Sequence, residues 1–382
     1  MTGDLWRQIQ FNPVQLLLPE GAFGLCSACM LPTLIESLDA RRELSPEQIS
    51  SAIAALVSES DSVETKAAFL AALARKVETT AEIAGFAREL RERSVAVPLD
   101  EATRSGEVID VCGTGGDRLN TFNISTTVAF VVAAAGICIA KHGNRAVTSQ
   151  SGSADVLEAL GIRIDLAPSD AARWLREHRF VFLFAPNYHP AFKNIGPARR
   201  LCAERGQRTI FNFLGPLLNP ARPSAQLIGV PRPQLCEPVA RVLQALGVRR
   251  GMVVCGQVGP DGGVDAAHLD ELSTLGANAI AEFYQDRGFH TSVLSPENFP
   301  LVPATLADLA GSDRQTNADI VRRLLHGEDR GPRRDAVLLN AAAALFVGGA
   351  VRSLAEGWEL ASERIDSGAA QSKLTELQEA SR

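Results

Sequence analysis

From Pro98 onward the sequence repeats one pattern: an apolar segment, a loop rich in glycine or polar residues, and a segment with helical periodicity. EVIDVCG leads through GTGGD into a helix that starts near Ser125, and GICIAKHGNR leads into a helix over SADVLEALG. RFVFLFAP, AQLIGVP and GMVVCGQ predict further strands. Strands that alternate with helices form a largely parallel sheet covered on both faces. We therefore expect residues 99–382 to form an α/β domain.

The preceding residues, 31–98, show helical periodicity only. Ser45, Pro46 and Gln48 fit the N-cap, the first helical position and the capping-box partner of one helix. Two more helices are predicted to begin near Ser62 and Thr79. These segments predict a small all-α domain, which helices around residues 190–206 are expected to complete. Residues 1–30 read as an irregular N-terminal arm.

Composition excludes some classes of protein. Lys and Arg number 38 against 44 Asp and Glu, and the net charge of −6 argues against a nucleic-acid binder. The longest apolar stretch, Val128 to Ala140, falls short of the roughly 18 residues needed to span a bilayer. The N-terminus lacks the basic and apolar regions of a secretory signal, so we expect a cytoplasmic protein without a membrane partner.

The seven cysteines are scattered and odd in number, which argues against a disulfide framework. Cys26 and Cys29 form a lone C-x-x-C, and no second ligand pair of suitable spacing is visible to complete a zinc site. We therefore expect neither structural zinc nor disulfides.

The loop Gly113–Asp117, GTGGD, precedes a helix that opens with Asn123-Ile124-Ser125-Thr126. Glycine lets backbone N–H groups approach an anion, and a helix N-terminus adds free N–H groups and a positive dipole. The loop matches neither nucleotide-binding template, G-x-x-x-x-G-K-[ST] or G-x-G-x-x-G. It predicts a phosphate or pyrophosphate site, with an ordinary glycine-rich turn as the alternative.

A second loop, Lys141 to Arg145, repeats this arrangement and adds cations before Ser149–Ser153 at the next helix start. The carboxyl ends of strands in such sheets carry the ligands. Two anion-binding loops at neighbouring strand ends predict a ligand with two phosphate groups.

Two further features carry charge. Asp270-Glu271 would suit Mg²⁺, which takes few protein oxygens and completes its shell with water and substrate phosphates. The alternative is an acidic surface turn. Arg199, in the pair Arg199-Arg200, could bind a substrate carboxylate in bidentate fashion. The alternative is a solvated pair.

The chain resembles the anthranilate phosphoribosyltransferase family. The resemblance runs from about Leu31 to Leu377 and rests on GTGGD, NIST, KHGNR, SGSADVLEALG, HPAFKNIGPARR, RTIFNFLGPLLNP, the Asp-Glu pair, RRDAVLLNAAAAL and IDSGAA, in that order. It implies a nucleoside phosphorylase/phosphoribosyltransferase-like fold: a small N-terminal α-helical domain, a larger α/β domain with a mostly parallel sheet, and an active site in the cleft. It also implies a homodimer joined through the small domain.

The resemblance implies an activity in tryptophan biosynthesis. The phosphoribosyl group of 5-phospho-α-D-ribose 1-diphosphate (PRPP) would pass to the amine of anthranilate, with release of pyrophosphate. One Mg²⁺ would be held by Ser125 with Glu271 and a second by Asp270 with Glu271. Gly113, Asn144 and Arg199 would contact anthranilate, and no covalent nucleophile is expected. PRPP would be bound by Gly113, Gly116, Asp117, Thr121, Asn123, Ile124, Ser125, Thr126, Lys141, His142, Gly143, Asn144, Arg145, Ala146, Val147, Thr148, Ser149 and Ser153.

The chain departs from the family's pattern at three positions. Arg118 stands where many relatives have Gly, Gln150 where Lys is frequent and Phe192 where Met is frequent. These departures leave the details of the aromatic substrate site open.

Two other functions fit parts of the sequence. A pyrimidine nucleoside phosphorylase would share the fold and a similar Lys-His loop, but GTGGD and the acidic pair favour PRPP. A non-catalytic relative that binds nucleic acid should have a basic face and eroded loops, whereas both loops are intact here.

Overall fold

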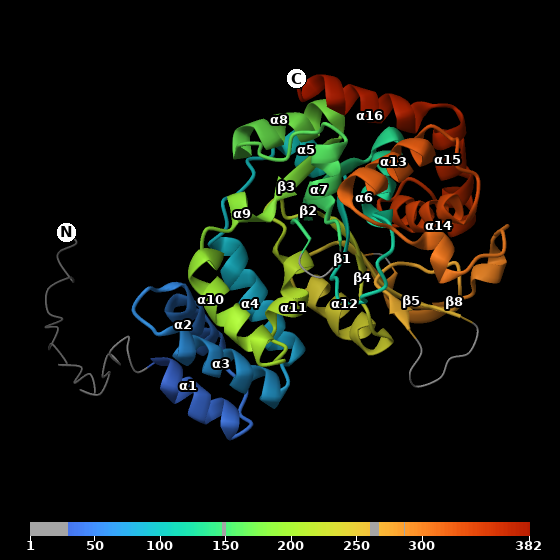
Figure 1. The fold of residues 1–382 in the computed structure, drawn as a ribbon. Helices are drawn as coiled ribbons and strands as arrows, with labels where there is room; N and C mark the ends of the chain where they lie inside the picture. The colour runs from blue at the N-terminus through green and yellow to red at the C-terminus, as the bar shows by residue number, and fades with distance from the viewer. Residues whose placement is uncertain (1–29, 147–149, 260–266, 286) are drawn as a thin grey trace, which may run out of the picture.

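The computed structural model describes residues 30–146, 150–259, 267–285 and 287–382. A helical domain, whose N-terminal helices are blue in Figure 1, lies beside a larger α/β domain. Within the described part of the chain, no helix is both long enough and apolar enough to cross a membrane. The fold class predicted from the sequence is confirmed.

The helical domain begins with α1 (Met30–Asp39), α2 (Pro46–Val57), α3 (Val63–Lys76) and α4 (Thr80–Glu92). Ser45 Oγ accepts a hydrogen bond from Gln48 N, and the Gln48 side chain accepts one from Ser45 N, so the predicted capping box is confirmed. A later helix, α10 (Phe192–Glu204), packs against α2 and α3. Its Ile195 and Ala198 enter the same apolar core as the four N-terminal helices.

The sheet has the order β3-β2-β1-β4-β5-β7-β8, with the two-residue strand β6 paired to β5. The first five strands in this order are parallel. The strands are β1 (Val108–Gly113), β2 (Cys138–Gly143), β3 (Phe180–Phe184), β4 (Ala225–Gly229), β5 (Arg250–Gln257), β6 (His268–Leu269), β7 (Asn278–Tyr284) and β8 (Gly288–Leu294).

The five parallel strands agree with the strands predicted from the apolar segments. The antiparallel pair β7–β8 was not predicted, and it extends one edge of the sheet. Positions along β8 are mostly exposed. An edge strand of this kind lacks the continuous apolar run that marks a buried parallel strand.

Helices cover both faces of the sheet. On one side α6 (Ile124–Ala134) and α14 (Pro332–Val347) pack on the strands, with α13 (Arg314–Leu325), α15 (Leu354–Asp366) and α16 (Ala369–Ala380) outside them. The Ala-rich C-terminal segment is thus the buried helix that its composition predicted. On the other side α12 (Cys236–Ala245) lies between β5, β7 and α4. The remaining helices include α5 (Glu101–Ser105), α7 (Ser153–Ala159), α8 (Pro168–His178), α9 (Ala185–Tyr188) and α11 (Phe211–Leu214).

One apolar core joins the helical domain to the sheet. It contains α2 to α4, α10, α12 and strand residues such as Ile228, Val253 and Phe283. The five cysteines within the described residues are buried and free. Cys26 and Cys29 lie outside the described residues.

Candidate active site

The first loop is built around the carboxylate of Asp270. Gly115 N donates a hydrogen bond of 2.6 Å to Asp270 Oδ2. A Cβ atom at Gly113 would lie 2.2 Å from the same oxygen, so any other residue at this position would displace the Asp270 carboxylate. The end of β1 and the turn after β6 are therefore held in direct contact.

The acidic pair meets the start of α6. Ser125 N donates to Glu271 Oε1 over 3.2 Å. Burial, then the charges of Asp117 and Glu271, raise the pKa of Asp270 well above its ordinary value, and burial raises the pKa of Glu271 to about 7. These carboxylates resist ionising together, so a bound cation would stabilise them strongly.

The donor set fits Mg²⁺. It consists of two adjacent carboxylates and the Ser125 hydroxyl, all hard oxygen ligands. Among the described residues no three His, Cys, Asp or Glu side chains converge into a preformed metal centre. Few protein ligands, completed by water and substrate phosphate, are the usual arrangement for Mg²⁺.

The hydrogen bonding at the start of α6 is incomplete within the described residues. Asn123, its N-cap, makes no capping hydrogen bond, because Asn317 Nδ2 donates to its Oδ1 over 2.9 Å. Thr126 Oγ1 is buried and has no partner among the residues that the structure describes. A buried hydroxyl without a partner costs free energy, and an anion at this helix start would satisfy it.

Both cations of the second loop, Lys141 and Arg145, already make hydrogen bonds within the protein. Lys141 is fully buried, and its Nζ donates to Val111 O (2.6 Å) and to Ser125 Oγ (3.1 Å). The Arg145 guanidinium donates to both carboxylate oxygens of Glu158 (2.6 and 2.9 Å) and to Asp155 (3.0 Å).

Asp155 also closes the base of this loop, since its Oδ2 accepts hydrogen bonds from Ala146 N (3.0 Å) and Gly152 N (2.9 Å). The loop is therefore tied to α7 at both of its ends.

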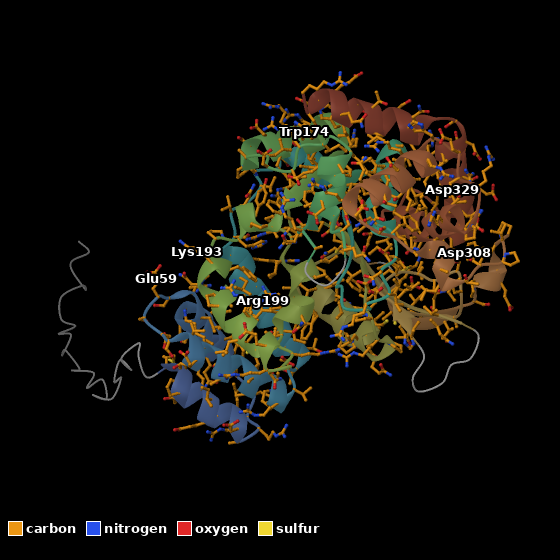
Figure 2. All side chains as sticks on the ribbon, viewed as in Figure 1. Glu59, Trp174, Lys193, Arg199, Asp308 and Asp329 are labelled. Atoms are coloured by element: carbon orange, nitrogen blue, oxygen red, sulfur yellow. The ribbon has the colours of Figure 1, made fainter. Side chains whose placement is uncertain are left out.

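Arg199 lies on α10, where the helical domain meets the α/β domain (Figure 2). Its guanidinium stands 5.8 Å from the Phe192 ring centroid and 5.1 Å from that of Phe211, within cation–π range. Burial lowers its pKa, yet no carboxylate in the described part of the chain pairs with it. A partly buried guanidinium without an anion is suited to bind one.

A line of rings connects Arg199 to the second loop. His142 and His189 have centroids 5.0 Å apart, and His189 lies 5.6 Å from Phe192. The Nε2 atoms of the two histidines are 3.1 Å apart, so only one of them carries a proton there. Burial lowers the pKa of His142 to about 3 and that of His189 to about 4, so both are neutral near pH 7.

The structure brings most of the predicted residues to the carboxyl ends of β1 and β2. Arg199 approaches from the helical domain through the ring line. Val147, Thr148 and Ser149 lie outside the described residues, and Gln150 is exposed. Arg118 adopts a left-handed conformation with φ of 61°. Such a conformation is disfavoured for residues other than Gly.

Three participants were missed from the sequence. Asp155 and Glu158 are three residues apart and share a face of α7, but this spacing does not show that Arg145 turns toward them. Phe211 lies within RTIFNFLGPLLNP, and no local pattern places it beside Arg199.

Comparison with known proteins defines the class. Residues 105–371 match the family model described as glycosyl transferase family, a/b domain, and residues 32–94 match the one described as glycosyl transferase family, helical bundle domain. The chain is thus a glycosyl transferase built from these two parts.

More particularly, the chain belongs to the anthranilate phosphoribosyltransferase family. It is 45% identical to the anthranilate phosphoribosyltransferase of Symbiobacterium thermophilum over 91% of this chain and 97% of that protein. The structure of the Thermus thermophilus enzyme superposes with a TM-score of 0.80 at 38% identity, covering 91% of this chain and 99% of the other. The Saccharomyces cerevisiae enzyme in complex with PRPP and Mg gives 0.80 at 27% identity, covering 92% and 99%.

Proposed function

We propose that the chain transfers the 5-phosphoribosyl group of PRPP to the amine of anthranilate in tryptophan biosynthesis, giving N-(5-phosphoribosyl)anthranilate and pyrophosphate. Arg199 carries the proposal: its guanidinium stands near two phenylalanine rings, without a carboxylate partner among the described residues. The carboxylate of anthranilate would pair with it, and the rings would pack against the benzene ring. Gly113 and Asn144 would complete this site.

PRPP would lie across the two strand ends. The pyrophosphate group would meet Gly116, Asp117 and the start of α6, where Thr126 Oγ1 lacks a partner within the described residues. The further contacts that we propose are Gly113, Thr121, Asn123, Ile124, Ser125, Lys141, His142, Gly143, Asn144, Arg145, Ala146, Val147, Thr148, Ser149 and Ser153. The Saccharomyces cerevisiae relative in complex with PRPP and Mg supports PRPP as the ligand.

We assign two Mg²⁺ ions to the site, one with Ser125 and Glu271 and the other with Asp270 and Glu271. Mg²⁺ would neutralise the charge that develops on the departing pyrophosphate. Burial is the main cause of the raised pKa values of the two carboxyl groups, and a cation bound beside them would stabilise their charged forms.

The remaining chemistry needs no covalent nucleophile. Cleavage of the bond between C1 and the pyrophosphate oxygen leaves a cationic ribosyl centre, which the uncharged aromatic amine attacks. The chain's own task is to orient the amine through Arg199 and to exclude water from the cation. Approach of the helical domain to the α/β domain would do both, since Arg199 and the phosphate loops lie on different domains.

The proposal also includes a cytoplasmic homodimer joined through the helical domain, as the family resemblance implies. Light scattering of the purified protein tests the assembly: a mass of one chain would reject it.

One assay tests the activity. Anthranilate fluorescence should disappear only when protein, PRPP and Mg²⁺ are all present. Unchanged fluorescence with correctly folded protein would reject the proposal. Phosphorolysis of thymidine or uridine without PRPP would favour a nucleoside phosphorylase, and tight, salt-sensitive binding of single-stranded DNA without turnover would favour a nucleic-acid binder.

A further inference from the structure

Strands β1 and β2 are joined at only one end. They pair at Val108 with Cys138 and at Ile109 with Ile139, and no further pairing links these two fully described strands. On their other sides the ladders continue to the strand ends, at Gly113 with Gly229 and at Gly143 with Phe184. The backbone hydrogen-bond ladder between β1 and β2 therefore ends after Ile109 and Ile139, although the two strands remain neighbours as they lead into the phosphate loops. We call this stretch without ladder bonds the opening.

Two side chains fill this opening: Asp110 of β1 and Asn219, which follows the short helix η2 (Gly215–Leu218). Asn219 Nδ2 donates to Asp110 Oδ2 over 2.8 Å and to Ala140 O over 2.7 Å. His142 N donates to Asp110 Oδ1 over 3.2 Å. Both side chains are fully buried. We call Asp110 and Asn219 the wedge.

The wedge replaces the hydrogen bonds of a continuous ladder. Ala140 O and His142 N bind wedge side chains, and Val111 O accepts from Lys141 Nζ. A closed ladder would satisfy such backbone groups without burying a carboxylate, and burying a charge is costly. Burial raises the pKa of Asp110 to about 6, with Lys141 acting in the opposite direction. The opening is therefore a feature that the chain maintains at a cost in stability.

The wedge is itself anchored. Asn219 Oδ1 accepts from Ala221 N over 2.9 Å, which fixes the orientation of its amide. Just before it, Leu217 O accepts from Arg91 Nε of α4 over 2.5 Å. Asn219 thus connects the open strand ends to a segment held by the helical domain.

We propose that Asp110 and Asn219 are positioning residues that set the distance between the Gly113–Asp117 loop and the Lys141–Arg145 loop, and so the fit of a ligand with a phosphate group at each end. The inference rests on the proposed function. Neither side chain is exposed, so both act through the backbone: Asp110 lies three residues before Gly113 and binds His142 N directly.

The chemistry of the pair suggests a swap experiment. Asp110→Asn leaves one oxygen to serve both His142 N and Asn219, and Asn219→Asp places two carboxylates face to face. In the double variant D110N/N219D, an amide again faces a carboxylate, with its oxygen toward His142 N. The bond to Ala140 O is lost, and the carboxylate oxygen that replaces Nδ2 faces this carbonyl oxygen, so the recovery is expected to be partial.

We expect kcat of each single variant to fall by about 10²-fold, which is the effect of displacing the substrates by about 1 Å. In the double variant, kcat should be at least about tenfold higher than in the single variants. Binding of Mg²⁺-pyrophosphate, measured by calorimetry, should stay within about threefold of the native value in all three, because the pyrophosphate group is proposed to meet the first loop only. General misfolding would instead abolish both turnover and the binding of Mg²⁺-pyrophosphate.

Native kcat in the single variants would overturn the proposal, as would loss of pyrophosphate binding in parallel with kcat and without recovery in the double variant. If neither single variant folds, Asn219→Ser, which keeps one donor, should lose kcat but not pyrophosphate binding, and native kcat in it would also overturn the proposal. Turnover by the native protein is measured first, so failure of the proposed function is recognised separately.

Discussion

The two loops that follow β1 and β2 arise from the same sequence pattern but differ in their hydrogen bonding. The first faces a helix start with an unpartnered Thr126 hydroxyl, within the described residues, and carboxylates that need a cation. The second has its cations already engaged, Lys141 beneath the strands and Arg145 on α7. A strand, a polar loop and a helix therefore predict where an anion binds, but not which charges are still available to it.

The largest effect is expected at the first loop. Replacing Asp270 by Asn together with Glu271 by Gln should lower turnover by about 10³-fold and remove its dependence on Mg²⁺, because both ions lose their carboxylate ligands. Turnover measured across a range of Mg²⁺ concentrations checks this. The matched control, Glu297→Gln with Glu359→Gln, removes two exposed charges and should have no effect. Mg²⁺-stimulated turnover in the first variant would move the metal site elsewhere.

The second-largest effect on turnover is expected at Arg199, which lies on α10 and belongs to neither loop. Arg199→Ala should lower kcat/KM for anthranilate by about 10- to 100-fold, the usual range for a lost charged hydrogen bond, and leave the KM for PRPP nearly unchanged. Steady-state kinetics with each substrate varied in turn measures both. Arg200, its exposed neighbour, is the matched control. An unchanged KM for anthranilate would contradict the assignment.

The histidine pair beside the second loop should appear in the pH dependence of stability. His189 has a pKa near 4 when folded against 6.5 ordinarily, so between these values the unfolded chain binds more protons and the free energy of unfolding rises with pH. His142 acts in the same direction, whereas the raised pKa values of Asp110, Asp270 and Glu271 act in the opposite one.

His189→Asn should therefore flatten this rise, by at most about 1.4 kcal/mol per pH unit. Urea denaturation between about pH 4.5 and 6.5 gives the slope. Equal slopes in native protein and variant would show that His189 titrates normally.

The smallest effect concerns Arg145. Glu158→Gln removes one of its two carboxylate partners, and since a partly exposed pair is worth about 0–1 kcal/mol, PRPP binding should strengthen by about two- to fivefold as Arg145 becomes available. Calorimetric titration with PRPP measures this. Weaker binding would show instead that Arg145 acts as a support for the loop and not as a phosphate ligand.

Features with local causes could be predicted from the sequence. The strands that end at Gly113 and Gly143, the capping box at Ser45 and the buried C-terminal helix all follow from periodicity and capping within a few residues. Edge strand β8 could not, since exposure removes the apolar run that marks a buried strand.

Within the site, the sequence predicted which loops take part but not their partners. Arg145 was expected to serve as a free cation, because nothing local shows that the side chains of Asp155 and Glu158 turn toward it. The contact between His142 and His189 joins residues 47 positions apart, and only the tertiary fold creates it. The local sequence predicts where the loops lie, whereas long-range packing determines which of their charged side chains are already paired.

The placement of α10 has a consequence for exchanging parts between related enzymes. This helix follows three strands of the sheet along the chain, yet its apolar residues Ile195, Ala198 and Cys202 complete the core of the N-terminal helices. A fragment that ends at Pro98 would lack one helix of the helical bundle. The complementary fragment would contain α10 with its apolar face exposed. A chimera that inherits its helical part from a relative should therefore inherit residues 192–204 as well, together with Arg199.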